Sequence, residues 1–180
     1  SMLYQSGSIR KLGRVDKGDA FLDTYQLERE RGITIFSKQA QLSIGDLKIT
    51  LLDTPGHVDF SAEMERTLQV LDYAILVING ADGIQGHTET LWRLLERYQI
   101  PVFLFINKMD QAGTNKDKLI KELKKRLNEN CVDFSSSDID GFNESIAVCN
   151  EYVLEDFLEN GTIETEQISK MIKRRELFPC

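Results

Sequence analysis

Residues 102–110 read Val-Phe-Leu-Phe-Ile-Asn-Lys-Met-Asp, a short apolar run that passes directly into a polar turn. Two other apolar runs, at residues 49–52 and 73–78, are equally short and rich in β-branched or aromatic residues. Runs of this kind are typical of strands buried on both faces of a parallel sheet. We therefore expect an α/β fold in which a mostly parallel sheet is flanked by helices.

Helical periodicity fills most of the sequence around these runs. Apolar residues recur at helical spacing within residues 60–71 and 88–98. Residues 38–44 alternate polar and apolar side chains, which predicts a half-exposed edge strand, and Gly45-Asp46 would join it to the next strand as a hairpin. In the last third we expect a loop at 133–143 and helices at 115–127, 144–159 and 164–175.

Composition excludes several classes of protein. The 180 residues include 22 Lys and Arg against 29 Asp and Glu, a formal net charge of −7 that argues against nucleic-acid binding through a general positive field. Residues 115–127 nevertheless form a strongly basic amphipathic helix, for which a solvated face and a ribosome or RNA contact both remain open. No apolar run approaches the ~20 residues of a membrane helix.

Cysteine usage indicates a reducing compartment. The three cysteines are Cys131, Cys149 and Cys180, an odd number without any C-x-x-C spacing. That pattern suits neither a zinc site nor a disulfide framework, so we expect reduced thiols and a cytoplasmic location.

Ligands of parallel sheets bind at the carboxyl ends of the strands, where this sequence places polar motifs. The first is Asp53-Thr54-Pro55-Gly56-His57. A carboxylate at position 53 would suit Mg²⁺, usually through a bound water, and the glycine N–H at position 56 could approach a terminal phosphate. His57 could orient a water, although Pro-Gly is also ordinary turn chemistry by itself.

Asn107-Lys108-Met109-Asp110 is the second motif, and it suits a guanine base. The carboxylate of Asp110 would accept hydrogen bonds from N1–H and the N2 amino group, two donors that adenine lacks. The stem of Lys108 would cover the base and Asn107 would bond its edge. A plain polar loop is the alternative for this motif taken alone.

The third element is Arg31-Gly32-Ile33-Thr34-Ile35. A threonine hydroxyl is a good Mg²⁺ ligand, and loops of this kind become ordered by a γ-phosphate and its metal. Periodicity alone would make it only a helix end running towards a strand.

The three motifs, in this order and at these separations, resemble the GTP-binding domain of translational GTPases of the elongation factor G group. The segments that look most like the tetracycline-resistance ribosomal protection proteins are Ser6-Gly7, residues 15–18 and residues 23–32. The resemblance covers essentially Leu3–Pro179, and it implies a P-loop GTPase-like fold.

The resemblance also implies an activity, which is ribosome-stimulated hydrolysis of GTP to GDP and phosphate. It implies that Thr34 and Asp53 serve Mg²⁺, that His57 orients the attacking water, and that Ile33 shields His57 until the ribosome rearranges the site. The nucleotide-binding residues would be Thr34, Asp53, Thr54, Pro55, Gly56, His57, Asn107, Lys108 and Asp110.

One expected motif is missing, because no G-x-x-x-x-G-K-[ST] phosphate loop occurs in the sequence. In the family it would precede Leu3, and a Ser-Ala loop that closes over guanine would follow Cys180. We therefore expect an incomplete GTP-binding domain that alone binds GTP weakly and does not hydrolyse it. Residues 1–113 would form the GTPase core part, and residues 114–180 a helical C-terminal part with a family-specific insertion.

The missing first strand would lie centrally, between the strands at 48–53 and 73–79. Those strands must then pair directly, take a strand from another chain or leave a gap, and we expect rearrangement or self-association. A non-enzymatic binding module that has lost its phosphate loop is the main alternative function, and an ATPase is a weaker one. The match at Thr34, His57 and Asp110 favours part of a working enzyme, and Asp110 opposes adenine.

Overall fold

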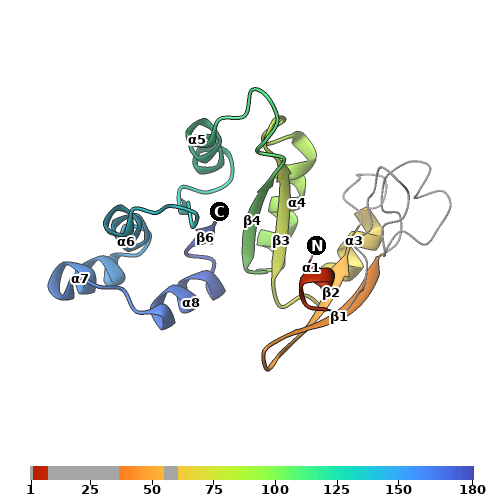
Figure 1. Ribbon diagram of the computed structural model, residues 1–180, viewed down its shortest axis with the longest axis horizontal. Coiled ribbons are helices and arrows are strands. Elements are labelled where there is room, and N and C mark those ends of the chain that lie inside the picture. Colours follow the sequence, from red (N-terminus) through yellow and green to blue (C-terminus); the bar gives the residue numbers. More distant parts are fainter. Residues whose placement is uncertain (1, 8–36, 55–60) are drawn as a thin grey trace. The chain divides into compact units, whose positions relative to one another are not determined.

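The computed structural model of the chain describes residues 2–7, 37–54 and 61–180 (Figure 1). It divides into two compact units, Ser1–Val70 and Leu71–Cys180, which are taken in turn below.

The first unit is built on a β-hairpin. Strands β1 (Lys38–Ile44) and β2 (Leu47–Asp53) pair antiparallel, with Ile44 opposite Leu47 across the turn. Gly45 has a φ of 58°, in the left-handed region that tight hairpins use at their first turn position. The predicted hairpin is therefore confirmed at the predicted turn.

Two short helices complete the described part of this unit. They are α1 (Met2–Gln5) and α3 (Ser61–Leu68), the second lying within the predicted helical segment 60–71. The buried side chains here are Leu3, Leu42, Met64, Thr67 and Leu68.

The second unit begins with a parallel strand pair. Strands β3 (Ala74–Asn79) and β4 (Val102–Asn107) run in register from Ala74–Val102 to Asn79–Asn107. Helix α4 (Gly86–Arg97) is the crossover connection that a parallel pair requires. This β-α-β unit confirms the parallel α/β arrangement expected from the apolar runs.

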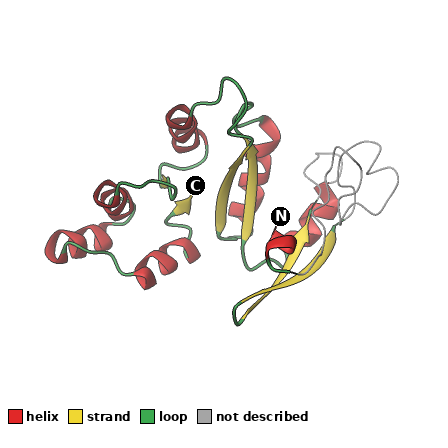
Figure 2. Cartoon of the chain, in the orientation of Figure 1, coloured by secondary structure: helices red, strands yellow, loops and turns green. Residues whose placement is uncertain are grey.

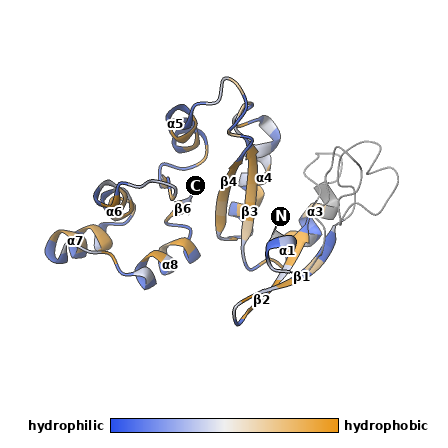
Figure 3. Cartoon of the chain, in the orientation of Figure 1, coloured by the Kyte–Doolittle hydropathy of each residue, from blue (hydrophilic) through white to orange (hydrophobic). Residues whose placement is uncertain are grey.

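The sheet is buried on one face and only partly covered on the other. Leu76, Ile78, Val102 and Leu104 are buried, as are Thr88, Trp92 and Leu95 of α4. On the other face Ile75, Val77 and Phe105 are 50%, 58% and 56% exposed, although Figure 3 colours both strands as hydrophobic along most of their length. The expectation of burial on both faces is wrong for these positions, because the described residues leave them uncovered.

The described strands pair as β1–β2, β3–β4 and β5–β6. Direct pairing of β2 with β3, one of the arrangements expected for a sheet without its first strand, is not among these ladders. Pairing with a second copy stays a prediction.

The C-terminal part is mainly helical (Figure 2). Its elements are α5 (Lys116–Arg126), β5 (Cys131–Val132), α6 (Ile139–Ala147), α7 (Glu151–Asn160), α8 (Thr165–Lys173) and β6 (Phe178–Pro179). Its core is formed by Val132, Ile146, Val153, Met171, Ile172 and Leu177. Phe103 packs against this core, so the C-terminal part is attached to strand β4.

Two predicted boundaries in this part are wrong. The segment 133–143 is not all loop, since Asp138 caps α6 by accepting a hydrogen bond from the Gly141 N–H at 3.2 Å. The predicted helix 144–159 is two helices, because Asn150 caps α7 by accepting from the Val153 N–H at 3.1 Å. An N-cap residue has non-helical backbone angles, so a new helix begins after it even where the apolar spacing of the sequence continues without a break.

A pair of two-residue strands, which the sequence analysis did not predict, closes the C-terminal part. β5 and β6 are parallel, and the Cys180 N–H donates to the Val132 carbonyl at 2.8 Å. Beside them Trp92 meets Phe178 edge-on at 4.8 Å, and the Arg175 guanidinium lies 5.2 Å from both ring centroids. Arg175 also donates to the Ile100 carbonyl, so this cluster holds β6 against the β-α-β unit.

All three cysteines are free thiols. Burial raises the pKa of Cys149 to about 11, which keeps that thiol protonated and unreactive at neutral pH. Within the described ranges, no helix is long and apolar enough to cross a membrane.

The buried core of the C-terminal part predicts an asymmetric response to truncation. Leu177→Ala should lower the free energy of unfolding by about 2–5 kcal/mol, because Leu177 is 0% exposed and its loss leaves a cavity. Leu158→Ala, the same change at a side chain 76% exposed on α7, should cost less than about 0.5 kcal/mol. Urea unfolding followed by circular dichroism measures both, and equal losses would contradict the described core.

Candidate nucleotide-binding site

Two polar loops leave the parallel sheet at the same level. Asn79 and Asn107 are register partners at the carboxyl ends of β3 and β4, and each is followed by a tight turn. The carboxyl edge of a parallel sheet is where such folds bind ligands. The loop after β4 contains three predicted base-binding residues, which the structure brings together.

The loop after β4 is shaped by its own side chains. The Asn107 Oδ1 accepts from the Lys108 N–H at 2.9 Å, and Lys108 has a φ of 60°, in the left-handed region. The Thr114 hydroxyl lies 2.8 Å from the carbonyl oxygens of both Met109 and Gln111, and so holds the far side of the loop. The sequence analysis assigned no role to Thr114, since its contacts depend on the fold of the loop.

Lys108 and Asp110 point their functional groups outward from this loop. Both side chains are exposed, and no donor in the described ranges forms a hydrogen bond with the Asp110 carboxylate. An exposed carboxylate with all its acceptor positions open suits a ligand with two neighbouring N–H donors.

Gly80 allows the two loops to approach each other. Its N–H donates to the Asn107 carbonyl at 2.8 Å. A Cβ at this position would lie 2.7 Å from the Met109 sulfur and 3.1 Å from the Asn107 carbonyl oxygen, closer than ordinary contacts. A side chain larger than glycine here would have to displace the Met109 side chain and shift the Asn107 carbonyl by a few tenths of an ångström, a constraint that the sequence did not reveal because it arises between loops that are distant along the chain.

The turn after β3 is tied in the same way. The Asn79 amide donates to the Asp82 carboxylate at 2.6 Å and its Oδ1 accepts from the Ala81 N–H at 3.1 Å. Gly83, with a φ of 65°, approaches Glu122 of α5 so closely that a Cβ would lie 2.8 Å from its Oε2. Helix α5 is thus packed directly against this turn.

A group of three charged side chains, Glu89, Glu122 and Arg126, holds the C-terminal half of α5. Arg126 pairs with Glu122 at 2.8 Å and with Glu89 of α4 at 2.9 Å, and it also donates to the Ile84 carbonyl at 2.5 Å. Hydrogen bonds from Glu122 and then Glu89 raise the pKa of Arg126. These contacts join α5 to α4 beneath the two loops.

The predicted phosphate and metal residues lie mostly outside the described part of the chain. Asp53 ends β2 in the first unit, half-buried opposite Lys38, and Thr54 follows it. The residues outside are Ile33, Thr34, Pro55, Gly56 and His57. A carboxylate at a strand end is a hard oxygen donor of the kind Mg²⁺ prefers, so Asp53 fits the expected role. The described residues contain no cluster of three or more metal-ligating side chains.

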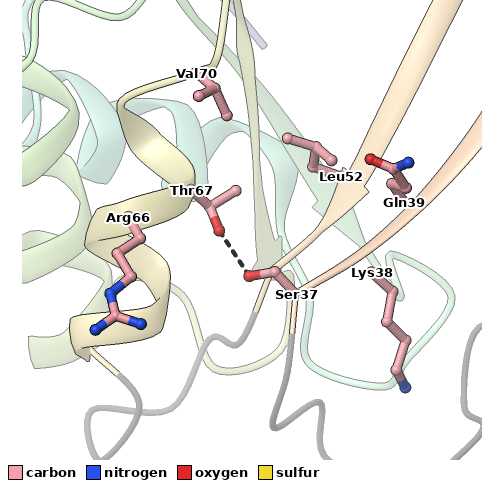
Figure 4. A pocket seen from close by; sticks show the side chains of 7 residues that line it. All are labelled: Ser37, Lys38, Gln39, Leu52, Arg66, Thr67 and Val70. Atoms are coloured by element: carbon pink, nitrogen blue, oxygen red, sulfur yellow. Dashed lines mark hydrogen bonds between the residues drawn. The ribbon is translucent and has the colours of Figure 1, made fainter.

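The first unit also contains a pocket of about 360 Å³ (Figure 4). It is lined by Ser37, Lys38, Gln39, Leu52, Arg66, Thr67 and Val70. The Ser37 and Thr67 hydroxyls bond each other across it at 2.6 Å. Of the predicted site residues that the structure describes, none lines this pocket.

A parallel β-α-β unit whose strands end level at polar loops belongs to the class of nucleotide-binding α/β domains. Residues 1–174 match the elongation factor Tu GTP-binding domain family, and the chain belongs to that family.

The relatives agree with the resemblance seen in the sequence. The chain is 46% identical over 132 residues to the tetracycline resistance protein TetP of Clostridium perfringens, covering 73% of the chain and 20% of the relative. It is 37% identical over 181 residues to TetS of Listeria monocytogenes, covering 94% and 28%, and 42% identical over 131 residues to elongation factor G of Mycoplasma pneumoniae, covering 73% and 19%. The predicted membership of the translational GTPases is confirmed. The chain spans less than a third of the length of each of these relatives.

The fold has a solved counterpart. A crystal structure of a protein from Thermus thermophilus matches with a TM-score of 0.81 over 99% of this chain and 34% of that chain. At 21% identity this likeness concerns the fold alone; together with the family match it confirms the GTPase-like α/β class predicted from the sequence.

The close approach at Gly80 predicts that a larger residue there lowers stability and disturbs the loop after β4. Gly80→Ala should destabilise the chain by about 1–3 kcal/mol, because overpacking displaces Met109 and the Asn107 carbonyl. Amide NMR signals of residues 107–111 should shift. Gly86→Ala is the matched control, since a Cβ there meets nothing within 4 Å.

A double variant tests the cause of this defect. In a Met109→Ala background, Gly80→Ala should cost clearly less, because the 2.7 Å contact is gone. An undiminished cost would show that Met109 does not limit this position.

Proposed function

We propose that the chain is the GTP-binding part of a translation factor of the elongation factor G or tetracycline-resistance ribosomal protection type. In the whole protein this part hydrolyses GTP to GDP and phosphate on the ribosome, in the cytoplasm. The observation that carries the proposal is the Asn107–Asp110 loop, with an open carboxylate at the carboxyl edge of a parallel sheet.

The loop after β4 selects guanine in this proposal. Asp110 accepts from N1–H and the N2 amino group, Lys108 covers the base with its aliphatic stem, and Asn107 bonds the base edge while holding the loop. Adenine would leave the carboxylate without donors, which is how polar sites reject a near-isosteric ligand. This is the step that favours GTP over ATP as the substrate.

The phosphate and water chemistry is assigned to the other two motifs. Thr34 and Asp53 hold Mg²⁺, which neutralises charge on the phosphates when it is bound. The backbone around Thr54, Pro55 and Gly56 approaches the γ-phosphate. His57 orients the attacking water, and Ile33 shields it until the ribosome acts.

Residues 1–113 are assigned to the GTPase core and residues 114–180 to the helical part with its insertion. The 180 residues contain no phosphate-loop pattern, so backbone N–H groups for the β- and γ-phosphates have to be supplied by flanking sequence. Charged hydrogen bonds contribute about 1.5–3 kcal/mol each, whereas association costs roughly 4–15 kcal/mol. The base loop alone therefore gives binding of about millimolar affinity or weaker.

Calorimetric titration with GTP, GDP and ATP in Mg²⁺ tests the proposal. The 180-residue chain should bind each nucleotide at about millimolar affinity or weaker. A longer version that includes flanking sequence with a phosphate loop should bind GTP and GDP far more tightly than ATP, and should release phosphate faster when ribosomes are added. Tight GTP binding by the 180-residue chain would contradict the proposal that flanking sequence supplies the phosphate contacts. Equal binding of ATP and GTP by the longer version would contradict the proposed selection of guanine.

Base selection gives a separate prediction for the longer version. Asp110→Asn should weaken GTP binding by about 10²–10⁴-fold, since two charge-assisted hydrogen bonds are lost. Binding of xanthosine triphosphate should strengthen, because the amide presents a donor to the O2 of xanthine. Asp117→Asn, at an exposed carboxylate on α5, is the control and should leave both affinities unchanged. An unaltered GTP preference in Asp110→Asn would exclude Asp110 from the base site.

A further inference from the structure

Helix α5 carries a charge opposite to that of the rest of the chain. Its eleven residues, Lys116–Arg126, include six cations and two anions, within a chain whose net charge is −7. Positive charge is therefore concentrated on one element.

The outward face of α5 is a stripe of lysines. Leu119 and Leu123 form its buried side. Lys118, Lys121 and Lys125 follow at spacings of three and four residues, which places them on one face, and all three are exposed. We call these three residues the lysine stripe. It spans about 10 Å along the helix axis at 1.5 Å per residue.

The stripe differs from Lys116 and Arg126, the two cations of α5 that form ion pairs. Lys116 pairs with Asp133 at 2.6 Å, and Arg126 pairs with two glutamates. Among residues 2–7, 37–54 and 64–180, no carboxylate forms an ion pair with any of the three lysines. The charge of the stripe is thus directed to solvent.

Helix stability accounts for only one lysine of the stripe, because Lys125 lies in the last turn, where a positive charge favours the helix dipole. Lys118 lies in the first turn, where a positive charge opposes the helix dipole. Like charges three and four residues apart repel each other, which offsets the favourable position of Lys125, so neutralising the stripe should change the stability of the helix little.

We propose that the lysine stripe binds the phosphate backbone of RNA. Lysine is depleted in protein–protein interfaces, whereas lysine contacts to phosphate dominate nucleic-acid binding that does not depend on base sequence. A nucleic-acid strand presents one charge per ~3.4 Å, so the stripe can meet several phosphates at once. The choice of RNA as the ligand rests on the proposed function, in which the whole protein acts on the ribosome. The complementarity between the lysines and a phosphate backbone is independent of that proposal.

The test measures binding of the 180-residue chain to a fluorescent RNA hairpin by anisotropy over a range of salt concentrations, without nucleotide. The variant Lys118→Gln/Lys121→Gln/Lys125→Gln should bind at least about tenfold more weakly, and the slope of log affinity against log salt should fall by about 2–3. The control Lys48→Gln/Lys173→Gln/Arg174→Gln removes the same charge at exposed positions outside α5 and should change binding little. Replacing the stripe by arginine should preserve binding.

Several outcomes would overturn the proposal. An equal loss in the control variant would assign binding to net charge rather than to the stripe. If poly-glutamate of matched charge competes as well as RNA, the partner is an acidic protein. If a DNA hairpin binds tenfold more tightly than the RNA hairpin, the assignment to RNA is wrong. Unchanged thermal unfolding of the stripe variant shows that folding is intact. Because no GTP is present, failure here leaves the proposed GTPase untouched, and failure of the nucleotide titration leaves the stripe untouched.

Discussion

The parallel pairing of β3 with β4 is the constraint on which the second unit depends. Register from Ala74–Val102 to Asn79–Asn107 brings both strands to an end at the same level. Only then can the Gly80 N–H reach the Asn107 carbonyl at 2.8 Å, and a glycine there lets Met109 lie beside it without displacement. The conformation of the base loop is thus set by a neighbouring strand as much as by its own residues.

The β-α-β unit could be predicted because its strands are short apolar runs with helical periodicity between them. The break between α6 and α7 could not, since an Asn at position 150 looks the same in a helix interior as at an N-cap. β5 and β6 were invisible for a different reason, because two residues carry no periodicity and their pairing joins segments far apart in the chain. Burial of both sheet faces was also overestimated, because an apolar run specifies what prefers to be buried and not what covers it.

The candidate site likewise contains residues that the sequence could predict and residues that it could not. Asn107, Lys108 and Asp110 could be predicted as a base site because they lie within four consecutive residues and their chemistry matches one base. Gly80 and Thr114 were missed, because a glycine and a threonine acquire these roles only through neighbours that the fold supplies. Thr34 and His57 are still known from sequence alone, as they lie outside the described residues.

The proposed function assigns base selection and phosphate binding to different parts of the chain. The base loop belongs to the second unit and relies on one open carboxylate, while Asp53 ends a strand of the first unit. A carboxylate discriminates strongly, because a ligand without matching donors leaves it desolvated and unpaired, yet the correct ligand gains only a few hydrogen bonds from it. Affinity for a nucleoside triphosphate must come from groups that neutralise and hold the phosphates. In the proposed function, the Asn107–Asp110 loop therefore decides which nucleotide is chosen, and the groups that hold the phosphates decide how tightly it is bound.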